Sequence, residues 1–325
     1  MGKWMIGVDL GGTRIKAALF DQAFEPVQEL IHPTEAAYGP EHVLGRIFHA
    51  INELLTLAGG LPGDMLCIGL GIPGLLDRER GVSIFSPNLP GWEQIEVVRA
   101  IRTRFDVPVF IDNDVRMNMY GEWRFGAGQG YRNLLLVTVG TGLGSGIVSD
   151  GSVLYGTTSS AGEIGHMNMY REGRPCRCGS SGCLGRYVSA VGMVNTLIER
   201  MKEGGTSVIQ QWVRGDVSQI EAQMLSLAYD EGDALAIEVM HDTGTLLGVG
   251  LANVINLLNP QRIIIGGGVS SAGDRLLNSV RESVNKRSLK LSGEACDIVQ
   301  ARLGSRAGTI GAAAYAYDQV RKLRQ

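Results

Sequence analysis

Two stretches of this 325-residue chain share one design, which constrains the fold more than any other feature of the sequence. The first is IGVDLGGTRIKAALFD, residues 6–21, and the second is LVTVGTGLGSGIVSDG, residues 136–151. Each contains an apolar strand, a turn of glycine and threonine, and a second strand that leads to Asp. We interpret both as β-hairpins whose small turn residues let a phosphate approach the backbone amides. Two such hairpins predict a duplicated domain that holds a phosphate between its halves.

The two turns differ in charge. The first carries Asp9 and Lys16, whereas the second contains only small and neutral groups. Asp9 can hold a metal ion or its waters, while the second turn can offer only amides and hydroxyls. The two hairpins are therefore predicted to contribute differently to one phosphate site.

The rest of the chain has an α/β pattern. Its 46 glycines gather after short apolar runs such as VDLGGT, IGLGIPG, VTVGTGLGSG and IIIGGGVSS, which places a site at strand ends. Helical patterns lie at about 41–58, 93–105, 114–123, 187–203, 233–258, 273–286 and 306–323. This length predicts two domains, which we place at 1–118, with the C-terminal helix of about 306–325 packing back on it, and at 119–305.

Two common nucleotide-binding motifs are absent or out of context. No G-x-x-x-x-G-K-[ST] sequence occurs, which argues against a P-loop enzyme. G-x-G-x-x-G occurs at Gly69, Gly71 and Gly74, but Pro73 interrupts it and no helical periodicity follows. Because a dinucleotide-binding turn must open a helix, the sequence argues against a Rossmann site.

Composition excludes several classes of partner. The net charge is −3 and there is no run of Lys or Arg, so nothing favours nucleic acid or a membrane surface. No apolar run is long enough to span a bilayer, and no signal peptide precedes the first strand. Five cysteines, an odd number with three of them clustered, fit a reducing compartment. We therefore expect a cytoplasmic protein.

A compact block of metal-ligating side chains lies between residues 163 and 183. His166, Cys176, Cys178 and Cys183 fall within eighteen residues, and imidazole and thiolate are the ligands that tetrahedral zinc prefers. Four ligands leave no position for substrate, so such a zinc would brace the loop while Glu163 faces the chemistry. The alternative is a group of unrelated thiols, but the clustering favours a structural zinc.

A polar pair follows the predicted strand VPVFI. Asn113 and Asp114 stand at the strand's C-terminal end, where a helix begins. Asp112, Asn113 and Asp114 are each able to cap that helix. Because ligands of α/β proteins bind at strand C-termini, at least one of these carboxylates is predicted to be functional.

Taken in order, these motifs resemble the ROK family (repressors, open reading frames and sugar kinases), and within it the glucokinase-like sugar kinases. The resemblance covers nearly the whole chain and rests on DLGGTRIK at 9–16, GIPG at 71–74, ND at 113–114, GTGLGSG at 140–146, GEIGH at 162–166, CRCGSSGC at 176–183 and GGGV at 266–269. It implies the actin-like, ribonuclease-H-like ATPase fold, in which two α/β domains hold ATP in the cleft between them.

The resemblance also implies roles for individual residues. Asp114 would be the general base and would bind the sugar, and His166 would serve both zinc and sugar through its two ring nitrogens. The other sugar contacts would be Asn88, Asn113 and Glu163. The residues at the phosphates of ATP and their Mg²⁺ would be Asp9, Gly11, Gly12, Thr13, Lys16, Thr141 and Gly142. Gly267 and Gly268 would border the adenosine.

The predicted activity is transfer of the γ-phosphate of ATP to the 6-hydroxyl of glucose or a related hexose, with Mg²⁺ as cofactor and a structural Zn²⁺. Two departures from the family pattern, Gly185 for a sugar-binding glutamate and Arg116 for an asparagine, leave the choice of hexose open. The alternatives are a sugar-responsive regulator or a catalytically weakened sugar-binding homologue. Regulators of the family add an N-terminal helix-turn-helix, for which Asp9 at the ninth position leaves no room. The resemblance also implies a homodimer or homotetramer.

Overall fold

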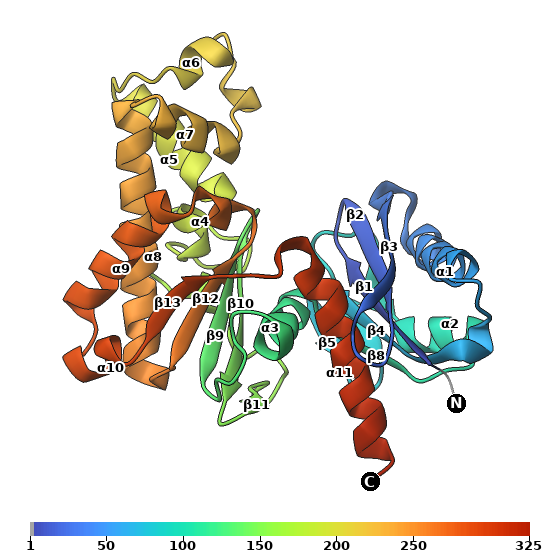
Figure 1. Ribbon diagram of the computed structural model, residues 1–325. Helices are drawn as coiled ribbons and strands as arrows, with labels where there is room; N and C mark the ends of the chain where they lie inside the picture. The colour runs from blue at the N-terminus through green and yellow to red at the C-terminus, as the bar shows by residue number, and fades with distance from the viewer. Residues whose placement is uncertain (1–2) are drawn as a thin grey trace. The chain divides into compact units, whose positions relative to one another are not determined.

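The computed structural model describes residues 3–325 and divides them into two compact units (Figure 1). Unit 1 contains the described residues up to Gly130, together with Tyr155–Ala161 and Arg302–Gln325. Unit 2 contains Tyr131–Leu154 and Gly162–Ala301. The first segment of unit 1 ends after helix α3 (Asp114–Phe125), and not at residue 118 as the sequence predicted. Helix α3 belongs to unit 1 because it packs along the C-terminal helix α11 (Ala307–Leu323).

Unit 1 is built on a five-stranded sheet with the strand order β3-β2-β1-β4-β8. Strands β1 and β2 form an antiparallel hairpin, while β4 and β8 run parallel to β1. The strands of this sheet are β1 (Trp4–Leu10), β2 (Arg14–Phe20), β3 (Pro26–Pro33), β4 (Met65–Ile72) and β8 (Val109–Asn113). A small second sheet contains β5 (Leu75–Asp77), β6 (Val82–Phe85) and β7 (Glu93–Ile95).

Unit 2 repeats this plan with the strand order β11-β10-β9-β12-β13. Strands β9 and β10 form the antiparallel hairpin, and β12 and β13 run parallel to β9. These strands are β9 (Leu134–Val139), β10 (Leu143–Ser149), β11 (Ser152–Val153), β12 (Arg262–Gly266) and β13 (Asp297–Gln300). Both predicted hairpins and the predicted duplication are therefore confirmed.

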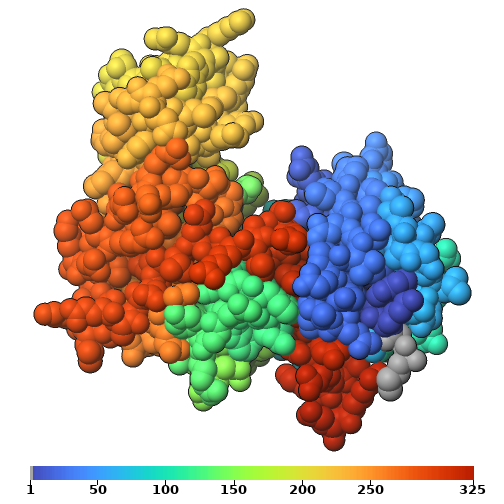
Figure 2. Space-filling model, viewed as in Figure 1, coloured from blue at the N-terminus to red at the C-terminus, as the bar shows by residue number. Residues whose placement is uncertain are grey.

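Alternation along β1 gives the sheet of unit 1 two different faces. Ile6, Val8 and Leu10 enter the core that is shared with α1 (Pro40–Leu57) and α2 (Val97–Arg104). Met5 packs with side chains of α11 on the other face. The red C-terminal helix accordingly lies against the blue N-terminal segment in the space-filling view (Figure 2). Asp9 follows the same alternation and therefore belongs to the face that α11 covers.

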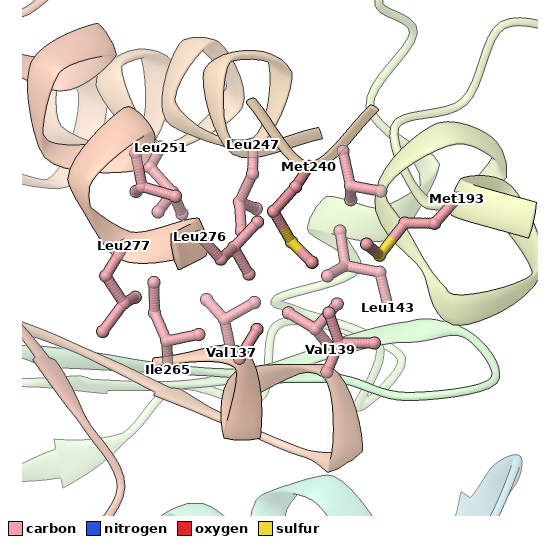
Figure 3. Close-up of a cluster of buried hydrophobic side chains, with 14 of the residues drawn as sticks. Val137, Val139, Leu143, Met193, Met240, Leu247, Leu251, Ile265, Leu276 and Leu277 are labelled. Carbon is pink, nitrogen blue, oxygen red and sulfur yellow. The ribbon is translucent and has the colours of Figure 1, made fainter. Parts of the chain in front are cut away.

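Unit 2 encloses its own core between sheet and helices. Val137 and Val139 of β9 and Ile265 of β12 meet Leu247 and Leu276 from the helices, as the close-up shows (Figure 3). Helix α8 carries thirteen buried residues and confirms the helix predicted at about 233–258. The helices of this unit are α4 (Gly185–Val188), α5 (Ala190–Lys202), α6 (Ile209–Trp212), α7 (Ala222–Asp230), α8 (Ala234–Leu258), α9 (Asp274–Arg287) and α10 (Lys290–Glu294).

Two predicted helices differ in detail from the structure. The segment predicted at 93–105 begins as strand β7 and becomes helix only at Val97. The segment predicted at 187–203 is divided at Ser189, whose hydroxyl accepts a hydrogen bond from the Gly192 amide and so begins a new helix. The G-x-G-x-x-G run lies in β4 and the turn to β5, which confirms that it opens no helix. No helix among residues 3–325 is both long and apolar enough to cross a membrane.

Candidate functional site

The outer two of three neighbouring strands in unit 1 carry acidic side chains near their carboxyl ends. The register pairs Asp9 of β1 with Gly71 of β4, and Gly71 with Asp112 of β8. Helix α3 begins two residues later, at Asp114. A Cβ atom at Gly71 would lie only 3.2 Å from the Cα atom of Asp114, so the bare glycine makes room for that residue. The fold thus gathers Asp9 and Asp114 at the carboxyl ends of parallel strands.

Asp114 is not used as a helix cap. The Asn113 side chain caps α3, because its Oδ1 accepts hydrogen bonds from the amides of Val115 at 3.0 Å and Arg116 at 3.4 Å. Its Nδ2 donates to the Gly74 carbonyl at 3.3 Å. Burial, and then the negative charge of Asp9, raise the pKa of Asp114 to about 7. A carboxylate with a pKa near neutrality can accept a proton and hold it during a reaction.

Asp9 faces Lys16 across the first hairpin. The Lys16 Nζ lies 3.6 Å from Asp9 Oδ2, and both side chains are partly exposed. Burial raises the pKa of Asp9, and the positive charge of Lys16 opposes this effect. On the other side, a Cβ atom at Gly308 of α11 would lie 2.7 Å from the Asp9 carboxyl carbon. The glycine in α11 therefore leaves the space that this carboxylate occupies.

The first turn is held from two directions. Thr34, which follows β3 and is fully buried, donates its amide to the Thr13 carbonyl at 2.9 Å and its hydroxyl to the Gly11 carbonyl at 2.6 Å. Asn88 lies on the other side, because a Cβ atom at Gly12 would be 2.9 Å from the Asn88 carbonyl oxygen. Gly11, Gly12, Thr13 and Asn88 are thus brought together.

The second turn receives one hydrogen bond from helix α5, and its tip is exposed. The Ala190 amide donates to the Gly140 carbonyl at 2.8 Å, and the Gly140 amide donates to the Gly142 carbonyl at 2.9 Å. Thr141 and Gly142 are exposed, and a Cβ atom at Gly142 would meet nothing within 4 Å. Neither packing nor strain explains this glycine, which leaves the backbone accessible to a ligand.

Another glycine pair of unit 2 lies directly after the strand that neighbours β9. Gly267 and Gly268 follow β12, which pairs with β9, and both are exposed. Gly267 has φ +85° and a Cβ atom there would lie 2.5 Å from the Val139 carbonyl oxygen, so glycine is required. A Cβ atom at Gly268 would meet nothing within 4 Å. The structure therefore places Gly267 and Gly268 beside the end of β9, in the same unit as Thr141 and Gly142.

The histidine and cysteines predicted as zinc ligands converge. The ligand atoms of His166, Cys176, Cys178 and Cys183 all lie within 4.8 Å of one another. Cys178 Sγ is 3.7 Å from Cys183 Sγ, and His166 Nδ1 is 3.6 Å from Cys176 Sγ. In a tetrahedron with ordinary Zn–S and Zn–N bonds these edges measure about 3.8 and about 3.6 Å. The four side chains therefore fit zinc.

Arg174 anchors the same loop to the helices behind it. Its Nη1 donates to the carbonyls of Arg186 at 3.0 Å and Gly192 at 3.1 Å, and its guanidinium lies 4.6 Å from the centre of the Tyr187 ring. Glu163 is exposed at the start of the turn Ile164–His166. A Cβ atom at Gly185 would lie 3.3 Å from the Gly165 carbonyl oxygen, so position 185 touches the turn that carries His166.

A buried polar network beside Asp114 escaped the sequence interpretation. Asp112 accepts from Arg116 Nε at 2.7 Å and from the Tyr155 hydroxyl at 2.9 Å. The Arg78 guanidinium lies 3.4 Å from the centre of the Tyr155 ring and donates to the Tyr315 hydroxyl at 3.1 Å. The Arg116 guanidinium is thus engaged by Asp112, which gives the arginine at this position a structural role. The i, i+4 spacing of Asp112 and Arg116 is a sequence signal for this pair, but nothing in the sequence connects Tyr155 to it.

Known proteins resemble the chain over nearly its full length. Residues 5–319 match the model of the ROK family. A glucokinase of Halalkalibacterium halodurans is 36% identical over 95% of this chain and 93% of its own. A xylose repressor of Caldicellulosiruptor bescii is 29% identical over 95% of this chain and 76% of its own.

The fold has a solved counterpart as well. The crystal structure of a ROK family glucokinase from Streptomyces griseus, in complex with glucose and AMPPNP, has a TM-score of 0.82 and 31% identity and covers 97% of this chain and 99% of that one. The predicted actin-like fold is thereby confirmed. On the family match, the relatives and the duplicated sheets, this chain belongs to the ROK family.

Proposed function

We propose that this protein is an ATP-dependent hexose kinase that transfers the γ-phosphate of ATP to the 6-hydroxyl of glucose or a related hexose. The observation that carries the proposal is Asp114, a partly buried carboxylate at a strand end with its pKa raised to about 7. The glucokinase relatives support the choice of reaction, and their names support a hexose as the acceptor.

In this proposal Asp114 is the general base. It accepts the proton of the sugar hydroxyl as that oxygen attacks phosphorus, which turns a poor nucleophile into an effective one. The sugar side is completed in unit 1 by Asn88 and Asn113. Because Asn113 already uses both ends of its amide within the protein, its role is to fix the turn that aims Asp114 as much as to contact sugar.

The first turn and Asp9 serve the phosphates from unit 1. Gly12 and Thr13 offer backbone amides, whereas the Gly11 amide donates to the Arg14 carbonyl at 2.9 Å and so shapes the turn. Lys16 adds a positive charge beside Asp9. Asp9 would hold Mg²⁺ directly or through water, and that ion, when bound, neutralises charge on the transferring phosphoryl group. The remaining barrier is lowered mainly by alignment of the attacking and leaving oxygens.

Unit 2 offers neutral groups and the zinc loop. The amides and hydroxyl of Thr141 and Gly142 would bind phosphate oxygens, while Gly267 and Gly268 would border the adenosine. Glu163 and the Nε2 atom of His166 would contact sugar hydroxyls. His166 Nδ1, Cys176, Cys178 and Cys183 would hold a structural zinc, which would fix the loop and the tautomer of His166.

The identity of the hexose depends on position 185. Gly185 stands against the turn of His166 and brings no carboxylate to the sugar. A site that pairs a hydroxyl discriminates strongly, so the missing partner broadens or redirects the choice among hexoses. Glucose is therefore the first of several hexoses to be tested, and it is not proposed as the only substrate.

The test is a coupled assay of ADP release with ATP and Mg²⁺ across glucose, mannose, allose, N-acetylmannosamine and N-acetylglucosamine. We expect sugar-dependent ADP release with at least one of them. ADP release with none would contradict the kinase proposal for common hexoses. Sugar binding without turnover, measured by calorimetry, would favour the sugar-sensing alternative, to which the xylose repressor relatives point. The homodimer or homotetramer, the cytoplasmic setting and the absence of nucleic-acid partners stay predictions.

A further inference from the structure

We propose a second metal site in unit 1, formed by His32, His49 and Glu53 and suited to a divalent transition-metal ion. His32 lies on β3, whereas His49 and Glu53 lie one turn apart on α1. Their ligand atoms all lie within 4.8 Å of one another. This site is separate from the cysteine-rich one in unit 2 and does not depend on the proposed kinase activity.

Two imidazoles converge on one carboxylate oxygen. Glu53 Oε2 lies 3.0 Å from His32 Nε2 and 3.3 Å from His49 Nε2. Donor atoms about 2.1 Å from a metal are separated by about 3.0 Å in octahedral and about 3.4 Å in tetrahedral geometry. Both measured edges fall in this range. A metal ion therefore binds with little movement of Glu53 relative to either imidazole, and the two imidazole nitrogens lie within 4.8 Å of each other.

The donor set defines the class of ion. Two neutral imidazoles and one carboxylate suit Zn²⁺, Ni²⁺, Co²⁺ or Cu²⁺, whereas Mg²⁺ and Ca²⁺ prefer oxygen ligands alone. Three protein ligands leave coordination positions for water. His49 is exposed and His32 and Glu53 are partly buried, so an ion can enter from solvent.

The chain contains its own comparison for this cluster. His42, on the same helix, places its Nε2 2.7 Å from Glu35 Oε2. Here a single imidazole meets a single carboxylate, which an ordinary hydrogen bond satisfies. The cluster of His49 adds a second imidazole to the same oxygen, and that addition distinguishes a metal site from a hydrogen-bonded pair.

A bound ion would join β3 to α1. Two residues beyond His32, Thr34 donates the hydrogen bonds that hold Gly11 and Thr13 in the first turn. Cross-linking this end of β3 stabilises the folded protein, because the ion binds the folded chain and not the separated ligands. We therefore expect a saturating ion to raise the melting temperature of the wild type by about 2–4 °C.

The test uses the full chain without a polyhistidine tag and with its cysteine site zinc-loaded, in the absence of sugar and nucleotide. Ni²⁺ is titrated by calorimetry into the wild type, His49→Gln, Glu53→Gln and the matched control His42→Gln. Loss of groups that merely support a metal ligand costs about 10–100-fold in affinity, so loss of a ligand should cost at least roughly 10-fold.

We expect the wild type and His42→Gln to bind one equivalent with equal affinity and to show the same rise in melting temperature. His49→Gln and Glu53→Gln should bind at least about 10-fold more weakly and lose that rise. No saturable equivalent on the wild type would overturn the site. An equal loss in His42→Gln would also overturn it, since it would show binding to scattered surface histidines. Because no kinase substrate is present, these outcomes are independent of the proposed function.

Discussion

The two hairpins have the same topology and different chemistry. In the first, Asp9 pairs across the hairpin with Lys16, and in the second, the equivalent Thr138 pairs with Gly144. The first turn is fixed by Thr34 and crowded by Asn88, whereas the second is tied by Ala190 and leaves Gly142 open. The comparison indicates that the two copies of one duplicated scaffold are suited to different roles. In the proposed site the first hairpin would supply charged groups, and the second would supply only neutral amides and hydroxyls.

The largest effect that this comparison predicts is on Asp114. Asp114→Asn should lower kcat by about 10²–10⁴-fold, because the amide cannot accept the proton of the hydroxyl. The melting temperature at pH 8 should not fall, since the variant removes a charge whose burial raises its pKa. Steady-state kinetics and thermal unfolding on the same sample measure both quantities.

Asp112→Asn, two residues earlier in β8, is the matched control. It removes half of a buried ion pair with Arg116, so the free energy of unfolding should fall by about 3–5 kcal/mol. The pattern expected is therefore opposite for two neighbouring carboxylates, with Asp114 governing rate and Asp112 governing stability. Near-normal kcat in Asp114→Asn would show that another group is the base.

The hairpins themselves are compared by Asp9→Asn and Thr138→Val, two nearly isosteric changes at equivalent positions. Asp9→Asn should cost about 10²–10³-fold in kcat, because it removes the charge that would hold Mg²⁺ at the phosphates in the proposed site. Thr138→Val should change kcat by less than about 3-fold, since the Thr138 hydroxyl reaches only the Gly144 carbonyl at 3.4 Å. Equal losses in the two variants would refute a division between charged and neutral halves.

Glycine-to-alanine substitutions compare how much room each turn leaves for an added Cβ atom. Gly12→Ala should destabilise the fold by about 1–3 kcal/mol, because the new Cβ atom would lie 2.9 Å from the Asn88 carbonyl oxygen. Gly142→Ala should leave the melting temperature unchanged, because its Cβ atom meets no protein atom within 4 Å. It should raise the KM for ATP, because the Cβ atom would occupy space that the proposed phosphate needs. Denaturant unfolding and ATP titrations separate the two effects. An unchanged KM in Gly142→Ala would remove the second turn from the ATP site.

The smallest expected effect is a shift in pH dependence. Asp114 must be ionised to act, so kcat/KM should fall as the pH decreases through about 7. The charge of Asp9 raises the pKa of Asp114, and Asp9→Asn should therefore move this acidic limb to lower pH. Stability should show the opposite trend, because the folded protein resists ionisation of Asp114 and loses stability as pH rises from 3.8 towards 7. An acidic limb that does not move in Asp9→Asn would contradict the proximity of the two carboxylates.

Local patterns were readable from sequence and distant contacts were not. The hairpins, the buried helix α8 and the convergence of His166 with three cysteines follow from periodicity and spacing over short distances. The pairing of Asp112 with Tyr155 joins residues 43 positions apart, so only the fold can show it. Arg116 illustrates the same limit. As a departure from a motif it suggested a change in the sugar pocket, but its guanidinium is engaged by Asp112.

The central claim, phosphoryl transfer to a hexose 6-hydroxyl, is tested most directly by identifying the product. Wild-type protein is incubated with ATP, Mg²⁺ and the hexose that gives the fastest ADP release, and the reaction is followed by proton-coupled ³¹P NMR. The account predicts ADP and a sugar phosphate whose phosphorus couples to the two protons on C6. A phosphorus coupled to one sugar proton, or inorganic phosphate as the sole new phosphate, would contradict it.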